Sequence, residues 1–181
     1  MNAPAIGLIE LSSIATGMLT LDAMVKQSPV TILRAHTVSP GKYLILVGGE
    51  VAEVDEAMQA GLERAAPFLI DQMFLPYAHE CLLPLLKGKL SHDPLDAMAI
   101  VETLTVASCL LAVDAAAKAA PVRPMEMHLA NQLGGKGYFT FTGDQADVEA
   151  ALEAAVTAAG QHGYSSAILP LPHPDIHPHV S

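Results

Sequence analysis

The sequence has little of what carbohydrate and nucleic-acid binding proteins use. It contains no tryptophan, and aromatic residues make up only 4% of its 181 residues. Such a composition argues against a surface on which sugars or bases stack. Lysine and arginine together number 9 against 19 acidic residues, a formal net charge of −10. Because affinity for nucleic acid comes largely from neutralising phosphates, we expect no nucleic-acid partner.

Cysteine and long apolar runs are scarce as well. The two cysteines, Cys81 and Cys109, are far apart and form no C-x-x-C motif, which favours reduced thiols over a disulfide framework or a zinc site. The longest apolar stretch, residues 97–117, is interrupted by Glu102 and Asp114, so no membrane span is expected. No basic residue precedes Lys26, so a secretory signal is not expected either, and the sequence predicts a cytosolic protein.

Sequence motifs of catalysis are also missing. The chain has no G-x-S-x-G, H-E-x-x-H or dinucleotide-binding fingerprint. Glu10 and Glu102 each end an apolar run, but neither has a complementary acid or nucleophile nearby in the sequence, so a bond to a neighbouring loop is the favoured role. We therefore predict no enzyme activity, no catalytic residue, no metal site and no cofactor.

What the sequence does contain is an internal repeat. Residues 5–30 align with residues 97–122 at a constant offset of 92, and Glu10, Asp22 and Lys26 meet Glu102, Asp114 and Lys118. After a two-residue insertion, residues 41–57 align with residues 135–151 at an offset of 94. Turn, charge and helix signals all recur, so the chain is predicted to hold two copies of one unit.

Both copies predict the same order of elements. Apolar strands at 6–11 and 98–103 precede helices, for which Ser12, Ser13, Thr103 or Thr105 offers an N-cap. Pro29 and Pro121 end these helices. Two strands joined by a turn follow, at 30–38 with 42–48 and at 122–130 with 137–142, and then a second helix and a last strand. The pattern predicts a βαββαβ unit of the α/β class, of the α+β, ferredoxin-like kind.

The first helix of each copy is expected to bury one apolar face. The residues at helical spacing are Ile14, Met18, Leu21 and Val25 in the first copy, and Val106, Leu110, Val113 and Ala117 in the second. Residues 85–96 are interpreted as a linker, which gives a first domain at 1–90 with its linker running to about 96, and a second domain at 97–181.

The stretch "SPGKY" at residues 39–43 combines glycine and lysine in a way that suggests a phosphate-binding loop. A phosphate loop opens into a helix, whereas Lys42 is followed by the β-type run 43–47. Proline presets φ at the second position of a turn, and glycine accepts the positive φ required at the third. We therefore predict a tight hairpin turn.

The repeated motifs resemble the bacterial microcompartment (BMC) shell-protein family over nearly the whole chain. The matching stretches are "GLIE", "DAMVK" and "DAAAK", "SPGKYLILVGGEV" and "LGGKGYFTFTGD", and "LPYAH" and "LPLPH". Two domains in one chain, each starting at its own first strand, are similar to the tandem, non-permuted shell proteins of the propanediol-utilisation type. This resemblance implies a homotrimer in which six domains mimic a hexamer, packed edge to edge with other shell proteins in the bacterial cytoplasm.

The same resemblance implies a central pore for small polar metabolites, lined by the loop between the second and third strands of each domain. The matching residues are Ser39, Pro40, Gly41, Leu133, Gly134 and Gly135. One branch of the family has a cysteine at the position of Ser39, and three such thiolates hold an iron-sulfur cluster. A serine hydroxyl is a poor ligand for a cluster, so none is expected. Tight hairpin turns without a pore role remain the alternative.

Histidines and lysines recur at equivalent positions. His36 and His128 each lie just before a pore loop, where they would bind a metal or tune pore charge, or serve only the structure. Lys26 and Lys118 match the family's edge lysine, although each is also placed to pair with the aspartate four residues earlier.

His79 and His173 match the histidine of the family's "PRPH" edge motif, whose arginine is replaced by Tyr77 and Leu171. A structural shell protein is thus the leading interpretation. The alternatives are a soluble ferredoxin-like trimer that binds or regulates through a small ligand, and a redox tile with a cluster at the pore.

Overall fold

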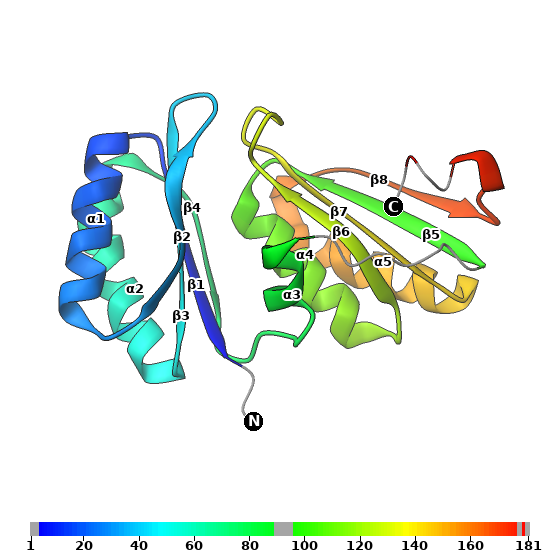
Figure 1. Cartoon of the computed structure of the whole chain (residues 1–181), viewed down its shortest axis with the longest axis horizontal. Coiled ribbons are helices and arrows are strands. Elements are labelled where there is room, and N and C mark those ends of the chain that lie inside the picture. Colours follow the sequence, from blue (N-terminus) through cyan, green and yellow to red (C-terminus); the bar gives the residue numbers. More distant parts are fainter. Residues whose placement is uncertain (1–3, 89–95, 177–178, 180–181) are drawn as a thin grey trace. The chain divides into compact units, whose positions relative to one another are not determined.

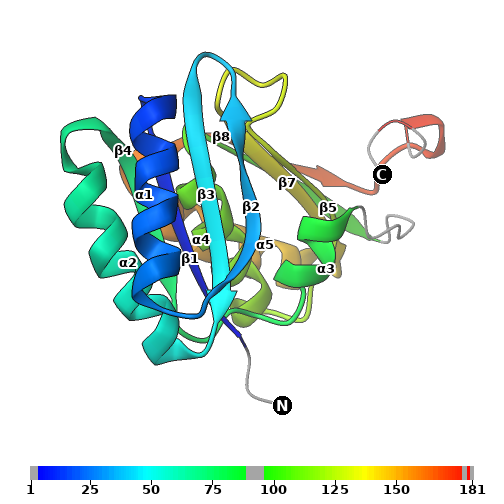
Figure 2. The same ribbon diagram turned by 60° about the vertical axis from the view of Figure 1, so that its left-hand side comes forward.

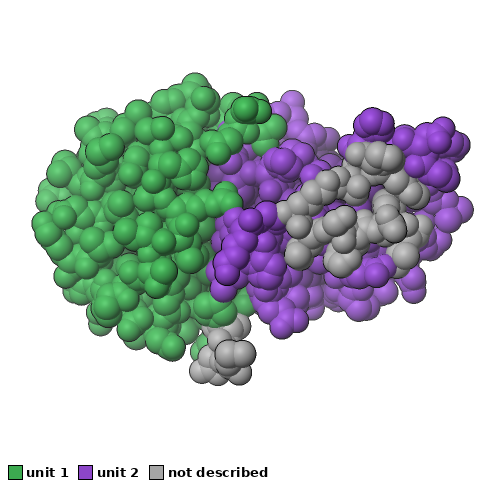
Figure 3. Space-filling view, viewed as in Figure 1, with its two compact units in different colours: residues 1–78, 131–135 green, residues 79–130, 136–181 purple. Residues whose placement is uncertain are grey.

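The structure, a computed structural model, describes residues 4–88, 96–176 and 179. The chain forms two compact units (Figure 3). Unit 1 comprises residues 1–78 and 131–135, and unit 2 comprises residues 79–130 and 136–181.

Unit 1 contains one βαββαβ motif, as the sequence predicts (Figures 1 and 2). Its strands pair antiparallel in the order β2-β3-β1-β4, and helices α1 and α2 pack against each other and on the sheet. The elements are β1 (Ala5–Leu11), α1 (Ile14–Gln27), β2 (Thr31–Val38), β3 (Lys42–Gly49), α2 (Val51–Ala65), the 3-10 turn η1 (Ala66–Phe68) and β4 (Leu69–Leu75).

Unit 2 repeats this motif in the strand order β6-β7-β5-β8. Its elements are α3 (Leu82–Lys87), β5 (Ala97–Thr103), α4 (Val106–Ala119), β6 (Arg123–Leu129), β7 (Gly137–Gly143), α5 (Gln145–Ala159), η2 (Gly160–His162), β8 (Gly163–Pro170) and η3 (Pro174–Ile176). Even the irregularities recur, because β2 and β6 each carry a register shift at equivalent positions.

Side-chain caps start the first helix of each copy. Ser13 accepts a hydrogen bond from the Thr16 backbone amide, and Thr105 accepts one from the Ser108 amide. These caps confirm two of the four predicted candidates and fix where the helices begin. The short helix α3 was not expected from the sequence; its last residues fall inside the predicted linker at 85–96, and the rest of that linker lies largely outside the described residues.

The predicted buried face of α1 is wrong. Ile14, Met18 and Val25 are exposed by 37%, 56% and 39%, whereas the helix buries Gly17, Thr20 and Met24. The reason is close packing at Gly17, where a Cβ atom would overlap the ring of Tyr43 on β3. The more apolar face of α1 therefore points away from its own sheet. In α4 three of the four predicted residues are buried, namely Val106, Leu110 and Val113. This helix buries a second face as well, because Cys109, Ala112 and Ala116, the counterparts of the residues that α1 buries, are also inaccessible.

Candidate functional site

The first candidate pore loop is a three-residue connection. Strands β2 and β3 pair up to Val38 and Lys42, which leaves Ser39, Pro40 and Gly41 exposed between them. Gly41 has φ +80°, as a tight turn requires, and nothing lies within 4 Å of the place where its Cβ would be. The loop thus offers backbone and small side chains to its surroundings.

The second loop is longer and joins β6 to β7. The last strand pair is Leu129 with Gly137, and the Ala130 amide donates to the Lys136 carbonyl at 2.8 Å. Gly134 and Gly135 both have positive φ, at +63° and +87°. Residues 131–135 belong to unit 1 together with the first loop. The two loops are therefore alike in position within the repeat but different in length and shape.

The lysine of each Gly-Lys pair ties its hairpin to the first strand of its own copy. Lys42 Nζ lies 4.0 Å from the carboxylate of Glu10, which is 1% exposed. Lys136 Nζ lies 3.9 Å from the carboxylate of Glu102 and 3.2 Å from the centre of the Tyr164 ring. This role was missed by sequence reasoning. The signal was available, because both lysines and both glutamates recur in the repeat.

The two predicted near-pore histidines have different surroundings. His128 Nε2 lies 3.2 Å from Glu126 Oε2, and its ring stacks on Tyr138 with 4.8 Å between centroids. Burial, and then the charge of Arg34, lower the pKa of His36. The two imidazoles are therefore not equivalent, since His128 lies beside the Glu126 carboxylate and His36 lies near the cationic Arg34.

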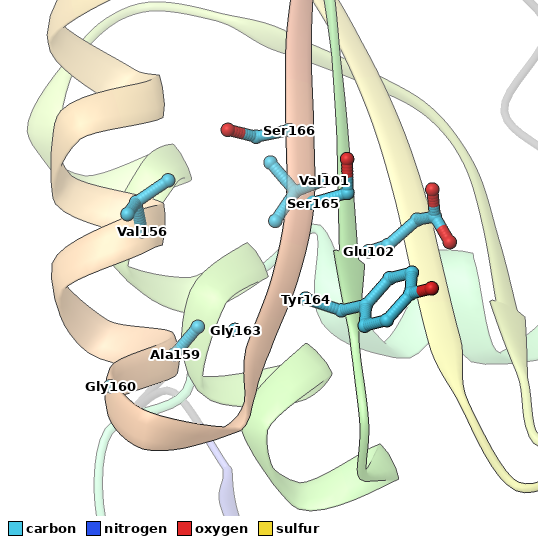
Figure 4. A pocket seen from close by; sticks show the side chains of 9 residues that line it. All are labelled: Val101, Glu102, Val156, Ala159, Gly160, Gly163, Tyr164, Ser165 and Ser166. Carbon is cyan, nitrogen blue, oxygen red and sulfur yellow. The ribbon is translucent and has the colours of Figure 1, made fainter.

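A pocket of about 320 Å³ lies beside β8 in unit 2 (Figure 4). Glu102 and Tyr164 stand side by side at one side of it, and small residues of α5 and β8 form much of the rest. The Glu102 carboxylate and the Tyr164 ring are both engaged by Lys136. Within the described part of the chain, no group of three or more His, Cys, Asp or Glu residues is arranged to hold a metal ion.

The predicted edge lysines form the ion pairs that their spacing suggests. Lys26 bonds Asp22 at 2.6 Å, and Lys118 bonds Asp114 at 2.6 Å. The two pairs differ in burial, because the Asp22 side chain is 54% exposed and that of Asp114 is 8% exposed.

The predicted edge histidines each stabilise a turn. His79 Nδ1 accepts from the Cys81 amide, and His173 Nδ1 accepts from the Asp175 amide, both at 3.3 Å. Tyr77 and Leu171, the residues predicted to replace an edge arginine, are exposed by 63% and 73%. Neither side chain can supply the forked hydrogen bonds of an arginine.

The outer face of α1 is apolar and uncovered in the single chain. Met18 and Leu19 are exposed by 56% and 57%, whereas Leu110, the counterpart of Met18 on α4, is fully buried. Exposed large apolar side chains grouped on one helix face are typical of an interaction surface.

The fold and these surfaces define a protein built of two tandem, ferredoxin-like α+β domains with glycine-containing hairpin loops. The BMC domain model matches residues 5–78 and again residues 97–174. The chain therefore belongs to the BMC domain family, as a member with two tandem domains.

Individual relatives agree with this assignment. The bacterial microcompartment shell protein PduT of Citrobacter freundii is 42% identical over 172 residues, which cover 93% of this chain and 93% of that protein. A crystal structure of a microcompartment protein from Desulfitobacterium hafniense DCB has a TM-score of 0.84 at 36% identity, covering 96% of this chain and 98% of that one.

A permuted relative shares the fold. The fused permuted hexameric shell protein MSM0275 from the RMM microcompartment has a TM-score of 0.64 at 20% identity, covering 86% of this chain and 83% of that one. The chain is thus a homologue of a bacterial microcompartment shell protein. None of the described helices has the length and apolar character needed to cross a membrane.

Proposed function

We propose that this protein is a structural tile of a bacterial microcompartment shell in the cytoplasm. Three copies close into a ring of six domains, and the ring packs edge to edge with other shell proteins. The observation that carries this proposal is the tandem BMC repeat together with its 42% identity to a shell protein over nearly the full length of both chains.

The physical support for a ring is the exposed apolar face of α1. The equivalent face of α4 is buried, so the two copies of the repeat differ in what still needs a partner. A head-to-tail contact between identical chains either closes a ring or grows a filament. Three chains with two domains each close a six-domain ring.

In this ring the loops at 39–41 and 133–135 surround a central pore for small polar metabolites. Small residues suit this place because six loops must approach one axis without Cβ clashes. Lys26, Lys118, His79 and His173 would then lie at the rim of the ring, where a junction between two domains of the ring borders the seam with a neighbouring tile. Since Tyr77 and Leu171 replace the arginine of the edge motif, we expect neighbours of other shell-protein types at these seams.

The proposed function is tested by mass and by co-expression. Native mass spectrometry of the purified protein should give three chains, and electron microscopy of cells that also express hexameric and pentameric shell proteins should show this chain incorporated into closed shells. A discrete oligomer that stays outside the shells and binds a small ligand saturably would favour the regulatory alternative instead.

The pore position of the first loop has its own test. The two cysteines of the chain are buried in other places, at the start of α3 and on α4, so no thiol lies in the loop at 39–41. In a ring, Ser39→Cys would bring three thiols to one axis. We expect the variant, reconstituted with iron and sulfide, to show iron-sulfur absorbance, while Ser12→Cys does not. A trimeric Ser39→Cys protein without this absorbance would place the loop elsewhere.

A further inference from the structure

The turn that follows β4 is docked on helix α4. Two hydrogen bonds close this turn. The Leu82 amide donates to the His79 carbonyl at 3.0 Å, and the Cys81 amide donates to His79 Nδ1. The His79 amide donates to Asp114 Oδ1 at 2.7 Å, and the Asp114 side chain is only 8% exposed. Helix α3, which continues from this turn, packs on α4 and β6 (Figure 1).

The chain ends with a second copy of this turn. The Ile176 amide donates to the His173 carbonyl at 3.0 Å, and the Asp175 amide donates to His173 Nδ1 at 3.3 Å. These bonds repeat those of the first turn in partner atoms and in length, at the offset of 94 that relates the two copies. Yet the side chains of His173 and Asp175 are exposed by 72% and 90%. The turn is therefore formed in advance of any docking.

Helix α1 carries the counterpart of the docking place on α4. Asp22 is the equivalent of Asp114 and holds its lysine in the same way, at 2.6 Å, but its side chain is 54% exposed. Around it, Met18 and Val25 are exposed by 56% and 39%. In the single chain, the first turn is thus docked on α4, whereas the equivalent C-terminal turn and the equivalent helix α1 are both exposed.

We propose that the C-terminal turn at 173–176 of one chain docks on α1 of a second copy, with the His173 amide donating to the Asp22 carboxylate. This inference rests on the proposed ring and names the segment and the carboxylate that join its subunits. A charged acceptor makes this hydrogen bond stronger than a neutral one, and the surrounding apolar side chains lose contact with water. The contact is heterologous, so each chain both gives and receives it.

One substitution between the turns alters the charge of the contact. Asp175 takes the place of Cys81, whose thiol pKa is raised to about 12 by burial and by the nearby Asp114 carboxylate. In the docked C-terminal turn, Asp175 therefore comes close to Asp22 and shares Lys26 with it. In the docked state the Lys26 ammonium group would balance the charge of both carboxylates. Its hydrogen bond to Asp22 is already formed in the single chain.

The placement of Asp175 beside Asp22 is testable by cross-linking. The double variant Asp22→Cys with Asp175→Cys should form disulfides between chains on mild oxidation, and a non-reducing gel should show covalent species up to three chains. The two single variants serve as matched controls and should give only monomers. The native thiols do not interfere, since Cys81 and Cys109 are buried.

The hydrogen bond itself is tested by dilution. Asp22→Ala removes the acceptor without harming a helix, and should raise the concentration at which the oligomer dissociates by about tenfold or more. Asp22→Asn keeps an acceptor oxygen and should dissociate at a concentration closer to that of the wild type. Asp55→Ala on α2 removes an aspartate that bonds a glutamine of its own helix, and should leave dissociation unchanged.

The outcomes separate the docking from the ring. The docking would be overturned, and the ring left intact, by the following combination of results. The wild type has the mass of three chains, the double variant cross-links no better than the single variants, and Asp22→Ala dissociates at the same concentration as the wild type. A wild type of another mass whose double variant still cross-links would overturn the ring and support the docking.

Discussion

At the scale of single residues, the contact between the first helix and the third strand of the motif pairs a glycine with a larger side chain in both copies, but the glycine is on the helix in one and on the strand in the other. In the first copy Gly17 leaves room for the ring of Tyr43, and in the second copy Cys109 and Gly137 stand at the equivalent positions. A Cβ at Gly137 would lie 2.7 Å from the Cβ of Cys109. A single larger side chain, Tyr43 in the first copy and Cys109 in the second, therefore fills the space between helix and strand.

This arrangement predicts a coupled pair of substitutions. Gly17→Cys alone should lower the free energy of unfolding by about 1–3 kcal/mol, because it overpacks the space that Tyr43 fills. Gly17→Cys combined with Tyr43→Gly copies the second domain and should recover part of that loss. Denaturant unfolding of the wild type, both single variants and the double variant measures the coupling. Additive effects would contradict the shared space.

The histidine beside the first loop gives a second prediction. Since burial and Arg34 lower the pKa of His36, the folded protein favours the neutral imidazole. Protonation therefore costs stability, and the contribution present above the ordinary pKa of about 6.5 is lost as the pH falls below it. NMR titration should find the pKa of His36 below the ordinary value and closer to it in Arg34→Gln. A wild-type value above 6.5 would contradict this environment.

At the scale of elements, each hairpin is anchored to the first strand of its own sheet by the lysine that follows the turn glycine. The two lysine–glutamate pairs differ in burial, because the Glu10 side chain is 2% exposed and that of Glu102 is 42% exposed. A buried carboxylate depends on its ionic and hydrogen-bonding partners far more than an exposed one does.

The anchors should therefore differ in energy. Lys42→Met should lower the free energy of unfolding by about 3 kcal/mol, because it removes a cation from beside a buried carboxylate. Lys136→Met should cost about 1 kcal/mol, since Glu102 keeps access to water and the lost contact with Tyr164 is partly exposed. Thermal or denaturant unfolding of the two variants gives the ranking. An equal loss, or a larger one for Lys136→Met, would contradict it.

At the scale of the whole molecule, the described part of the chain leaves the outer apolar face of α1 exposed. Helix packing within unit 1 uses Gly17, Thr20 and Met24, so the exposed side chains of α1 contribute little to the fold of that unit. Substitutions on this face should accordingly separate assembly from folding.

Met18→Glu tests this separation. A charged side chain in an apolar contact between subunits has to lose its water, so we expect the variant to dissociate to monomers at concentrations where the wild type forms the proposed trimer. Its thermal unfolding as a monomer should match that of wild-type monomer at high dilution. Analytical ultracentrifugation measures the masses, with Glu56→Gln on the exposed side of α2 as a control that stays trimeric. A trimeric Met18→Glu protein would contradict the role of this face.

Much of the architecture follows from local signals in the sequence. The repeat at offsets 92 and 94, the caps Ser13 and Thr105, the prolines that follow the helices and the Pro-Gly turn each act within a few residues. They therefore predict the βαββαβ order and the hairpin at 39–41 correctly. The family membership follows from the same motifs, since they recur twice in one chain.

Only the tertiary structure decided which face of α1 is buried, what the Gly-Lys lysines contact and how the chain continues after β4. The apolar spacing of α1 fits an outer face as well as an inner one, and the choice depends on Tyr43, a residue of another strand that needs the space above Gly17. The bond from His79 to Asp114 likewise joins residues 35 positions apart. A sequence pattern gives the spacing of apolar residues and the chemistry of neighbouring residues. Which of two possible helix faces packs on the sheet is determined by side chains from elements far away in the sequence.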